Sequence, residues 1–454
     1  MRYLFKTIKI IALICGLLLL TFVIINWGDE ELKPEVLQAL DWKAPHNAFE
    51  DNGYLILLGI EAPAEMSATQ VGTRMLKAEL ARYVSMQKNH KETPAPEPNP
   101  AEVDDYIDWK DNRCDYQKQE NCVDFYLQQG ADKLVIMLVA QDRLTTRFEA
   151  IKQSKNFAEV MPPMLSAQFP KFSPLVNASE LERIQAILDM SEGKMEQGVT
   201  RLIENSAFSR KLLRESNSLV LHMVAVAMMQ RDTRVLSELM VKYPKIAMQY
   251  ATQLAPVLAP ISAPEYSFKK AFKAEGNMVL QTWSHLKYAS VAEFAGPNLN
   301  VFKRFLSSIG FSPQATTNDA YDLAMLNAKL AEANATQLNA IKAEIEERYA
   351  DTFQMDYTLF TKKNPVGRIL NAVAVPEYAN YVERQHDLDG YISIVKLQLN
   401  VLVDGLEADK VALRDPYTQK LMQFDHDSGL LTFTGRQPAS ANVNKSNIYQ
   451  VKLH

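Results

Sequence analysis

The sequence is poor in the residues and motifs from which catalytic sites are commonly built. Of its 454 residues, three are Cys, seven are His and 16 are Gly, so glycine has about half of its usual share. We find no G-x-S-x-G, H-E-x-x-H, G-x-x-x-x-G-K-[ST], G-x-G-x-x-G or C-x-x-C motif. The sequence therefore points to no catalytic residue, no metal and no cofactor. Absence of motifs does not exclude an enzyme, but we favour a protein that is not one.

An excess of positive charge is also lacking. Lys and Arg number 49 against 54 Asp and Glu, which gives a net charge of −5. Proteins that bind nucleic acid by neutralising phosphates need the opposite balance. With 47% hydrophobic and 23% charged residues, the chain is neither disordered nor fibrous. We expect a folded protein that binds no nucleic acid.

A single hydrophobic run is long enough to cross a membrane. Residues 10–25 contain no polar side chain except Thr21, three cationic residues precede them, and Trp27 follows. Sixteen to eighteen helical residues span roughly 25 Å, close to the ~30 Å hydrocarbon core. Because no small-x-small triplet follows, we interpret residues 10–27 as an uncleaved transmembrane anchor. A cleaved signal peptide is the alternative.

Charge on the two sides of this run predicts its orientation. Cationic flanks stay in the cytoplasm, and the other side begins with Asp29, Glu30 and Glu31. We therefore predict a cytoplasmic stub of residues 1–9, with nearly all of the chain outside the cytoplasm. The next most apolar run, residues 219–229, is too short for a bilayer and predicts a buried core helix.

Cysteine placement agrees with an oxidising compartment. Cys15 lies inside the hydrophobic run, which leaves Cys114 and Cys122 outside. Residues eight apart on one helix are ~12 Å apart, beyond the roughly 7 Å limit of a disulfide, so the chain must turn between them. The C-x7-C spacing fits neither thiol-redox nor zinc motifs. We predict a structural disulfide between Cys114 and Cys122.

The negative charge is concentrated around this cysteine pair. Without the three cations of the anchor the chain carries −8, and residues 97–124 supply −6 of it. Alternating prolines at 94–100 precede this acidic segment and favour an extended spacer. The segment is either a solvated face, a weak Ca²⁺ site without the EF-hand residue order, or a docking patch for a basic partner. The candidate docking patch consists of Asp104, Asp105, Asp108, Asp111 and Asp115.

Helical periodicity dominates the rest of the chain. Residues 186–203 and 225–240 resemble each other, which suggests a helix-turn-helix unit recurring after about 38 residues, with turns at 191–193 and 230–232. Further helices are expected at 319–349, after Asn364, and at 377–403. Beyond residue 416 the period becomes two. We predict a mainly α fold: an N-terminal transmembrane helix, a helical array or bundle, and a small C-terminal antiparallel β element.

Shifts of composition divide the chain into seven segments. They are a cytoplasmic stub at 1–9, a transmembrane anchor at 10–27, juxtamembrane helices at 28–93, a Pro-rich and acidic disulfide-stapled segment at 94–130, a helical hairpin array at 131–260, a second helical part at 261–410 and a C-terminal β-hairpin element at 411–454.

One polar cluster falls within the helix expected at 377–403. His386, Asp387 and Asp389 lie within a single turn, and such residues can bind a metal or act as acid and base. On a helix, however, Asp387 points away from His386, so the three groups do not converge. Gly390 costs roughly 1 kcal/mol against alanine, which close helix packing usually offsets. We favour a structural role.

Two other polar positions also receive structural interpretations. Residues 425–429, Asp-His-Asp-Ser-Gly, are the types that a hairpin turn between strands requires, because they supply side-chain hydrogen bonds and positive φ. His222 stands alone on an apolar helix and is interpreted as a core histidine whose hydrogen bonds are satisfied.

Five segments spread from about residue 52 to 434 carry a resemblance. They are NGYLILLGIEAP, SLVLHMVAVAMMQRD, NPVGRIL, HDLDGYISIVKLQL and RDPYTQKLMQFDHDSGLLTF. In this order they resemble an uncharacterised family of single-pass proteobacterial inner-membrane proteins with a helical periplasmic domain. The resemblance implies a cytoplasmic N-terminus and a periplasmic body. It implies no activity, ligand or catalytic residue.

Our hypothesis is a non-enzymatic protein that is anchored in the inner membrane through residues 10–27. Its periplasmic helices would act as a scaffold or interaction surface for an envelope protein or polymer, since stacked helices supply extended binding surfaces. The alternative is a membrane-tethered hydrolase acting on cell-wall or lipid substrates. Its carboxylates would come from helices distant in sequence.

Overall fold

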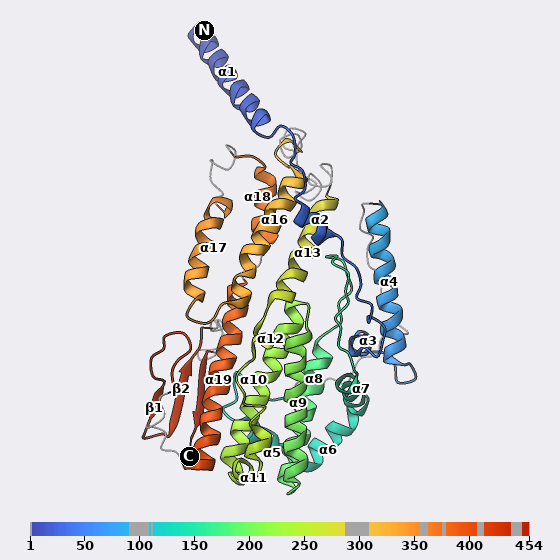
Figure 1. Ribbon diagram of the computed structural model, residues 1–454, viewed down its shortest axis with the longest axis vertical. Helices are drawn as coiled ribbons and strands as arrows, with labels where there is room; N and C mark the ends of the chain where they lie inside the picture. The colour runs from blue at the N-terminus through green and yellow to red at the C-terminus, as the bar shows by residue number, and fades with distance from the viewer. Residues whose placement is uncertain are drawn as a thin grey trace.

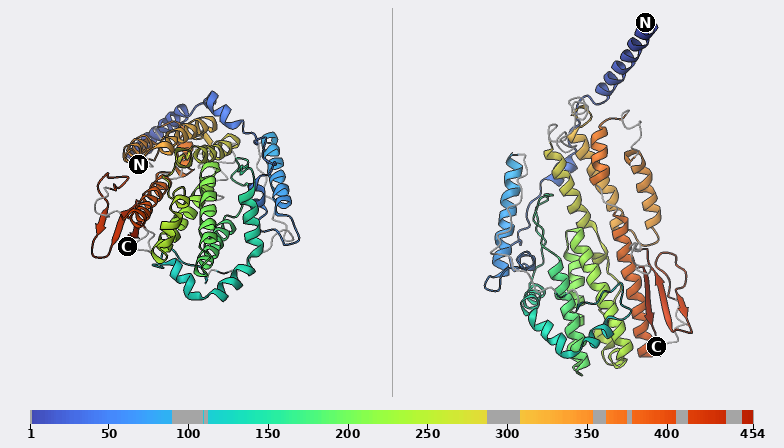
Figure 2. Two further views of the ribbon diagram at one scale, coloured as in Figure 1. Left: turned by 60° about the horizontal axis from the view of Figure 1, so that its bottom comes forward. Right: turned by 180° about the vertical axis from the view of Figure 1, so that it is seen from behind.

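The computed structural model describes residues 2–89, 109, 112–286, 308–353, 362–374, 378–405, 413–436 and 447–453. The fold is mainly α with a small C-terminal sheet, as predicted (Figure 1). The first helix projects from one end of an elongated body of helices, and the C-terminus lies near the other end. Seen from behind, helix α4 and the sheet lie on opposite sides of this body (Figure 2).

Helix α1 (Arg2–Ile25) has the properties of a membrane span. Its residues Phe5–Ile25 are long and apolar enough to cross a bilayer, and no other helix of the described residues passes the same test. Its large side chains face outward, with Leu18 66% and Ile24 63% exposed. The predicted N-terminal helix of membrane length is thus confirmed. The second apolar run lies in α10 (Leu219–Lys242), where Leu221 and Met228 are buried in the core.

The residues directly after α1 form hydrogen bonds with the helical body. Asn26 accepts a hydrogen bond from the amide of Asn364 at 2.8 Å. The carboxylate of Asp29 accepts the amides of Gln314 and Ala315 at 2.9 and 3.0 Å, at the N-terminus of α16 (Pro313–Ala328). A carboxylate there satisfies free N–H groups and the positive end of the helix dipole.

An ion pair continues this attachment. Lys33 pairs with Asp322 of α16 at 2.8 Å, and its amide donates to the side chain of Asn318 at 3.0 Å. We call Asn26, Asp29 and Lys33 the juxtamembrane clamp. It leaves little free linker between α1 and the helices of the body.

The centre of the body is an antiparallel set of three helices, α8 (Ser173–Ser191), α9 (Met195–Glu215) and α10. The predicted turn at 191–193 exists, with Gly193 at φ +84°. The turn predicted at 230–232 is wrong, because α10 continues through it. Arg231 and Asp232 are drawn into a buried ionic network (below) and do not form a solvated turn. The proposed 38-residue repeat therefore does not exist.

The remaining helices surround this centre. They are α2 (Pro34–Leu40), α3 (Gly53–Leu58), α4 (Ala68–Asn89), α5 (Cys122–Gln129), α6 (Ala131–Ala140), α7 (Asp142–Gln153), α11 (Lys245–Leu254), α12 (Ala263–Tyr266), α13 (Lys269–His285), η3 (Leu330–Glu332), α17 (Leu338–Phe353), α18 (Pro365–Ala374) and α19 (Ala379–Asp404).

The single helix predicted at 319–349 is wrong. The chain leaves the helix after η3 and begins α17 at Leu338. Between them the side chain of Asn334 accepts the amides of Thr336 and Gln337 at 3.1 and 3.0 Å. Such a local turn competes with the helical hydrogen bonds, which apolar spacing alone does not reveal.

The C-terminal sheet has three antiparallel strands, β1 (Gln423–Asp425), β2 (Leu430–Thr434) and β3 (Ile448–Lys452), in the order β1-β2-β3. The predicted turn between β1 and β2 is confirmed. Asp425 accepts the amide of Asp427 at 3.0 Å, and Gly429 has φ +68°. The sheet packs on α19, where a Cβ on Gly390 would lie 2.6 Å from the Phe433 ring. Gly390 thus allows the close packing of the helix that was expected there, and the element packed against it is a strand.

Candidate functional site

A cavity of about 350 Å³ lies between three parts of the body. One wall is α13, a second is the start of α10, and the third is the segment 159–169, which lies between α7 and α8 and rises beside α13 (Figure 1). Its lining combines aromatic, acidic, basic and amide side chains. The residues that matter below are Trp42, Glu159, Phe169, Lys273, Glu275 and Asn277.

Glu159 is the most buried charged group of this cavity, with 5% of it exposed. Its Oε2 accepts the amides of Asn217 and Ser218, both at 2.7 Å, at the N-terminus of α10. Its Oε1 is buried without a hydrogen-bond partner in the described residues. Burial raises the pKa of Glu159 above its usual value, although these hydrogen bonds favour the ionised form.

Glu275 approaches the same helix end from α13. Its Oε1 accepts the amide of Leu219 at 3.4 Å. Burial raises the pKa of Glu275, and the nearby Glu159 raises it further, because two carboxylates in one low-dielectric site disfavour double ionisation. Two carboxylates from segments 116 residues apart thus meet at the start of α10.

The other polar groups of the cavity are open. Lys273 and Asn277, one turn apart on α13, form no side-chain hydrogen bond or ion pair in the described part of the chain, and neither does the indole N–H of Trp42. Tyr83 holds the Trp42 ring edge-on, with ring centroids 5.2 Å apart. Lys270, also in the lining, donates to the carbonyl of Arg214 at 2.9 Å.

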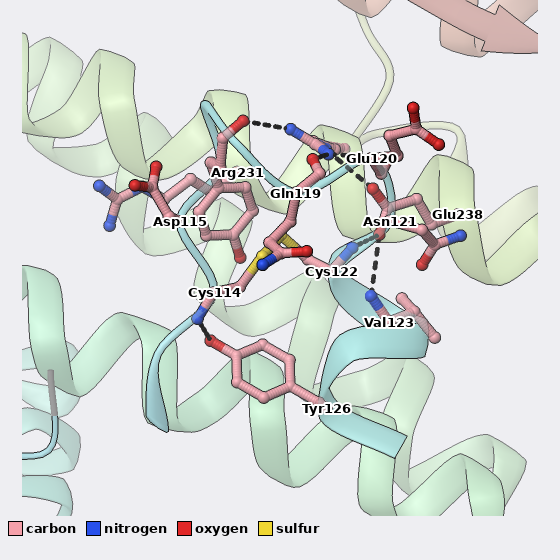
Figure 3. Close-up of a disulfide and its surroundings, with 12 residues drawn as sticks. Cys114, Asp115, Gln119, Glu120, Asn121, Cys122, Val123, Tyr126, Arg231 and Glu238 are labelled. Atoms are coloured by element: carbon pink, nitrogen blue, oxygen red, sulfur yellow. Dashed lines mark hydrogen bonds and ion pairs between the residues drawn. A yellow bond between two sulfur atoms is a disulfide. The ribbon is translucent and has the colours of Figure 1, made fainter. Parts of the chain in front are cut away.

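The predicted disulfide between Cys114 and Cys122 is present, with the two Cα atoms 5.7 Å apart (Figure 3). The chain turns between the cysteines, as their spacing requires. Glu238 of α10 accepts the amides of Cys122 and Val123 at 2.8 and 3.0 Å, at the start of α5. Arg234 donates to loop carbonyls, including that of Glu120 at 2.9 Å. The disulfide loop is therefore fixed to α10.

A buried ionic network lies beneath this loop. Tyr126 donates to Glu180 at 2.6 Å, and Arg183 donates to Glu180 at 2.8 Å and to Asp232 at 2.5 Å. Arg183 and Glu180 are fully buried. Burial raises the pKa of Asp232 to about 6. Arg183 and Arg231 hold the pKa of Glu180 below its usual value against the effect of burial. The network joins α5, α8 and α10.

Of the candidate docking patch, only Asp115 lies within the described residues. It pairs with Lys118 at 3.0 Å, and this hydrogen bond lowers its pKa. Asp104, Asp105, Asp108 and Asp111 lie outside the described residues, as does the proline run at 94–100. The docking patch stays a prediction.

His386, Asp387 and Asp389 each contact a different segment. His386 contacts the Tyr266 hydroxyl and the carbonyl of Ala333, and burial lowers its pKa to about 4. Asp387 accepts the Tyr417 hydroxyl at 2.5 Å and the amide of Arg436 at 2.9 Å, whereas Asp389 accepts the amide of Ile261 at 2.9 Å. These side chains attach neighbouring segments to α19 and form no common site.

His222 has the structural role expected of it. It is 1% exposed, and its two ring nitrogens contact Ser216 at 3.1 Å and Gln385 at 2.7 Å. Burial lowers its pKa to about 4. Within the described residues, no group of three or more His, Cys, Asp or Glu side chains is placed to hold a metal ion.

Sequence reasoning missed both carboxylates of the cavity. Glu159 follows a helix in an irregular stretch, and Glu275 is one of many charged residues on an amphipathic helix. Neither belongs to a motif. The only sequence sign is a carboxylate directly before Val160-Met161-Pro162-Pro163, where apolar residues predominate.

Comparisons of the chain with protein-family models, with curated proteins and with solved structures found no match. The resemblance to the proteobacterial inner-membrane family stays a prediction. The fold and the cavity define the class: a helical protein with one N-terminal helix of membrane length and a cleft of mixed polarity.

Proposed function

We propose that this chain is an inner-membrane protein with a periplasmic helical body, and that it acts by contact with an envelope protein or polymer. The cleft between α10 and α13 is the observation that carries the proposal. It combines open hydrogen-bonding groups with aromatic walls, which is typical of a binding site.

The juxtamembrane clamp supports an uncleaved anchor. Asn26 donates its side-chain amide to the carbonyl of Phe22 in α1 at 2.9 Å and accepts the amide of Asn364 in the body. One residue thus joins the last turn of the membrane helix to the helices that follow. An anchor joined in this way holds the cleft in a defined orientation to the membrane.

The environment of Glu159 favours contact over catalysis. A general acid or base must exchange a proton with a group within hydrogen-bond reach. In Glu159 two main-chain amides occupy Oε2, and Oε1 is shielded from solvent. Glu159 therefore serves to hold the start of α10, where its negative charge is favourable.

A membrane-tethered hydrolase is the second candidate. The observation in its favour is the pair Glu159 and Glu275, two carboxylates of raised pKa in one cavity. A hydrolase predicts that the purified protein releases soluble fragments from cell walls, or fatty acids from lipid vesicles, and that Glu275→Gln abolishes the release. We expect no release from either substrate. Release that Glu275→Gln abolishes would replace the contact function.

Crosslinking in intact cells tests the contact function. We would place a photoreactive residue at Asn277 in the cleft, with Met248 on α11, 58% exposed, as the matched control. We expect a specific adduct from position 277 and none from position 248. Absence of an adduct at 277, or equal adducts at both positions, argues against the cleft as the contact site.

A reporter fusion tests the topology. An enzyme that is active only in the periplasm, fused after Asp29, should be active, and the same enzyme fused before Lys9 should be inactive. The opposite result would reverse the proposed orientation.

A further inference from the structure

The open polar groups of the cleft include both donors and acceptors. Lys273 and the Trp42 indole can only donate, Glu275 can only accept through its second oxygen, and the Asn277 amide does both. A ligand that satisfies all of them must itself donate and accept at closely spaced positions. Hydroxyl groups do so, since each offers one hydrogen and two lone pairs.

The charges of the lining balance. The lining contains two carboxylates, Glu159 and Glu275, and two lysines, Lys270 and Lys273, so the cleft has no formal excess of either sign. A strongly anionic or cationic polymer would meet like charge on one wall and lose hydration without full compensation. The balance favours a ligand without net charge.

The aromatic walls add a second requirement. Trp42 is half-buried and held by Tyr83, and Phe169 is 37% exposed. Such rings bind flat, weakly polar surfaces, such as the C–H faces of a sugar ring, while polar groups at the side bind its hydroxyls. A volume of about 350 Å³ is near the lower end of small-molecule sites, so the cleft takes a short segment of a chain.

A peptide fits this wall less well. A peptide that binds as an added strand needs free main-chain N–H groups along the groove. Residues 161–163 of the wall are Met-Pro-Pro, and proline has no N–H. The wall therefore offers side chains and no row of main-chain donors.

We propose that the cleft binds a short segment of a neutral glycan, with Trp42 as its platform and Asn277 and Glu275 as its hydrogen-bonding groups. This inference rests on the proposed contact function and names its ligand. The polymer would lie between α13 and segment 159–169, on a body that the clamp fixes to the anchor.

Isothermal titration of the full-length protein in detergent tests the proposal. The probes are chitotetraose and maltotetraose, both neutral, with tetra-alanine as the competing class. We expect saturable binding of at least one glycan and none of the peptide. Asn277→Ala and Trp42→Ala should each weaken binding tenfold or more, and Trp27→Ala, a tryptophan outside the cavity, should not. Asn277 has no side-chain partner in the described residues, so its variant should keep the wild-type melting temperature.

The outcomes distinguish a failure of the glycan proposal from a failure of the proposed contact function. Failure of both glycans to bind overturns the glycan proposal, and so does binding that neither variant weakens. If an adduct still forms from position 277, the contact function stands and its ligand is of another class. Absence of both glycan binding and adduct contradicts both proposals.

Discussion

At the scale of single residues, burial changes what a charged side chain does. Glu159 and Asp232 are both buried carboxylates of raised pKa, and each keeps one buried oxygen without a hydrogen-bond partner in the described residues. Glu159 binds amides at the start of α10, and Asp232 accepts from Arg183 and Asn205. Such groups are costly to bury, and hydrogen bonds that favour the ionised form offset part of that cost.

The raised pKa of Glu159 predicts a pH dependence of stability. A carboxyl group with a higher pKa in the folded than in the unfolded state binds its proton more tightly when folded. The native state therefore loses stability as pH rises from the usual carboxyl range through the raised pKa. Glu159→Gln keeps an acceptor for the amides without this titration. Urea unfolding at pH 4.5 and 7.5 measures the free energy of unfolding of both proteins. The value for the variant, relative to that of the wild type, should be higher at pH 7.5 than at pH 4.5.

The pKa of Glu275 is raised as well, so Glu159→Gln should remove only part of the pH dependence of stability. The exposed Glu192, changed to Gln, is the control and should leave it unchanged. If instead the wild type becomes more stable relative to the Glu159 variant as pH rises, the hydrogen bonds from the amides affect the pKa of Glu159 more than burial does.

At the scale of elements, close contacts decide how the secondary structures fit together. Gly390 on α19 lies against Phe433 of β2, and Gly435 follows that strand against the Asp387 carboxylate. Helix propensity would favour alanine at 390, but the ring leaves no room. The small sheet thus packs closely on α19 at two glycines, where no side chain keeps the elements apart.

We predict that Gly390→Ala destabilises the protein by about 1–3 kcal/mol, because overpacking outweighs the gain in helix propensity. Thermal or urea unfolding measures the loss. The double variant Gly390→Ala/Phe433→Leu should lose less stability than the sum of the losses in the two single variants, because the smaller leucine side chain removes the clash. Additive costs would place the strain elsewhere.

The disulfide acts on one loop of the same assembly. Changing both Cys114 and Cys122 to Ser should cost roughly 2.5 kcal/mol, the loop-entropy value for a closed loop of about nine residues. Urea unfolding of the double variant checks this, and reduction of the wild type should give the same loss. Cys15→Ser, on the exposed face of α1, is the matched control and should cost nothing. Equal stability of the wild type, the double variant and Cys15→Ser would contradict a stabilising role of the disulfide.

At the scale of the whole molecule, the juxtamembrane clamp connects a single membrane-length helix to a large body. Asp29 and Lys33 both bind α16, which lies at the end of the body nearest α1 (Figure 1). A free linker of the same length would let the body rotate relative to α1. The clamp restricts that freedom and so holds the cleft in a constant direction relative to this helix.

Replacing Asp29 and Lys33 together by Ala should free this junction. We expect limited proteolysis between residues 26 and 33 to become several-fold faster, with little change in the melting temperature of the body, because exposed local contacts open without global unfolding. The exposed pair Asp41 and Lys43, both changed to Ala, is the matched control and should leave the rate unchanged. A double variant with the wild-type rate would show that the clamp does not restrain the junction.

Local patterns in the sequence determined several features of this protein. An apolar run of membrane length, two cysteines eight residues apart, and the turn residues at 425–429 each depend on neighbours in the chain. Their physical cause lies within a few turns of backbone, so the helix of membrane length, the disulfide and the hairpin could be predicted. One failure was also local, because the Asn334 turn broke a helix that apolar spacing had joined. The other depended on tertiary contacts: α10 continues through the turn expected at 230–232, where Asp232 pairs with Arg183 of α8.

The cleft was decided by the tertiary structure alone. Glu159 and Glu275 belong to no motif, and they meet because α7, α8, α10 and α13 pack in one arrangement. Likewise, the clamp joins residues 26–33 to segments 285 to 338 positions later. A single sequence records which residues a chain has. Which of them share a low-dielectric pocket is set by the burial of the whole core, because that packing depends on contacts between segments that no local pattern links.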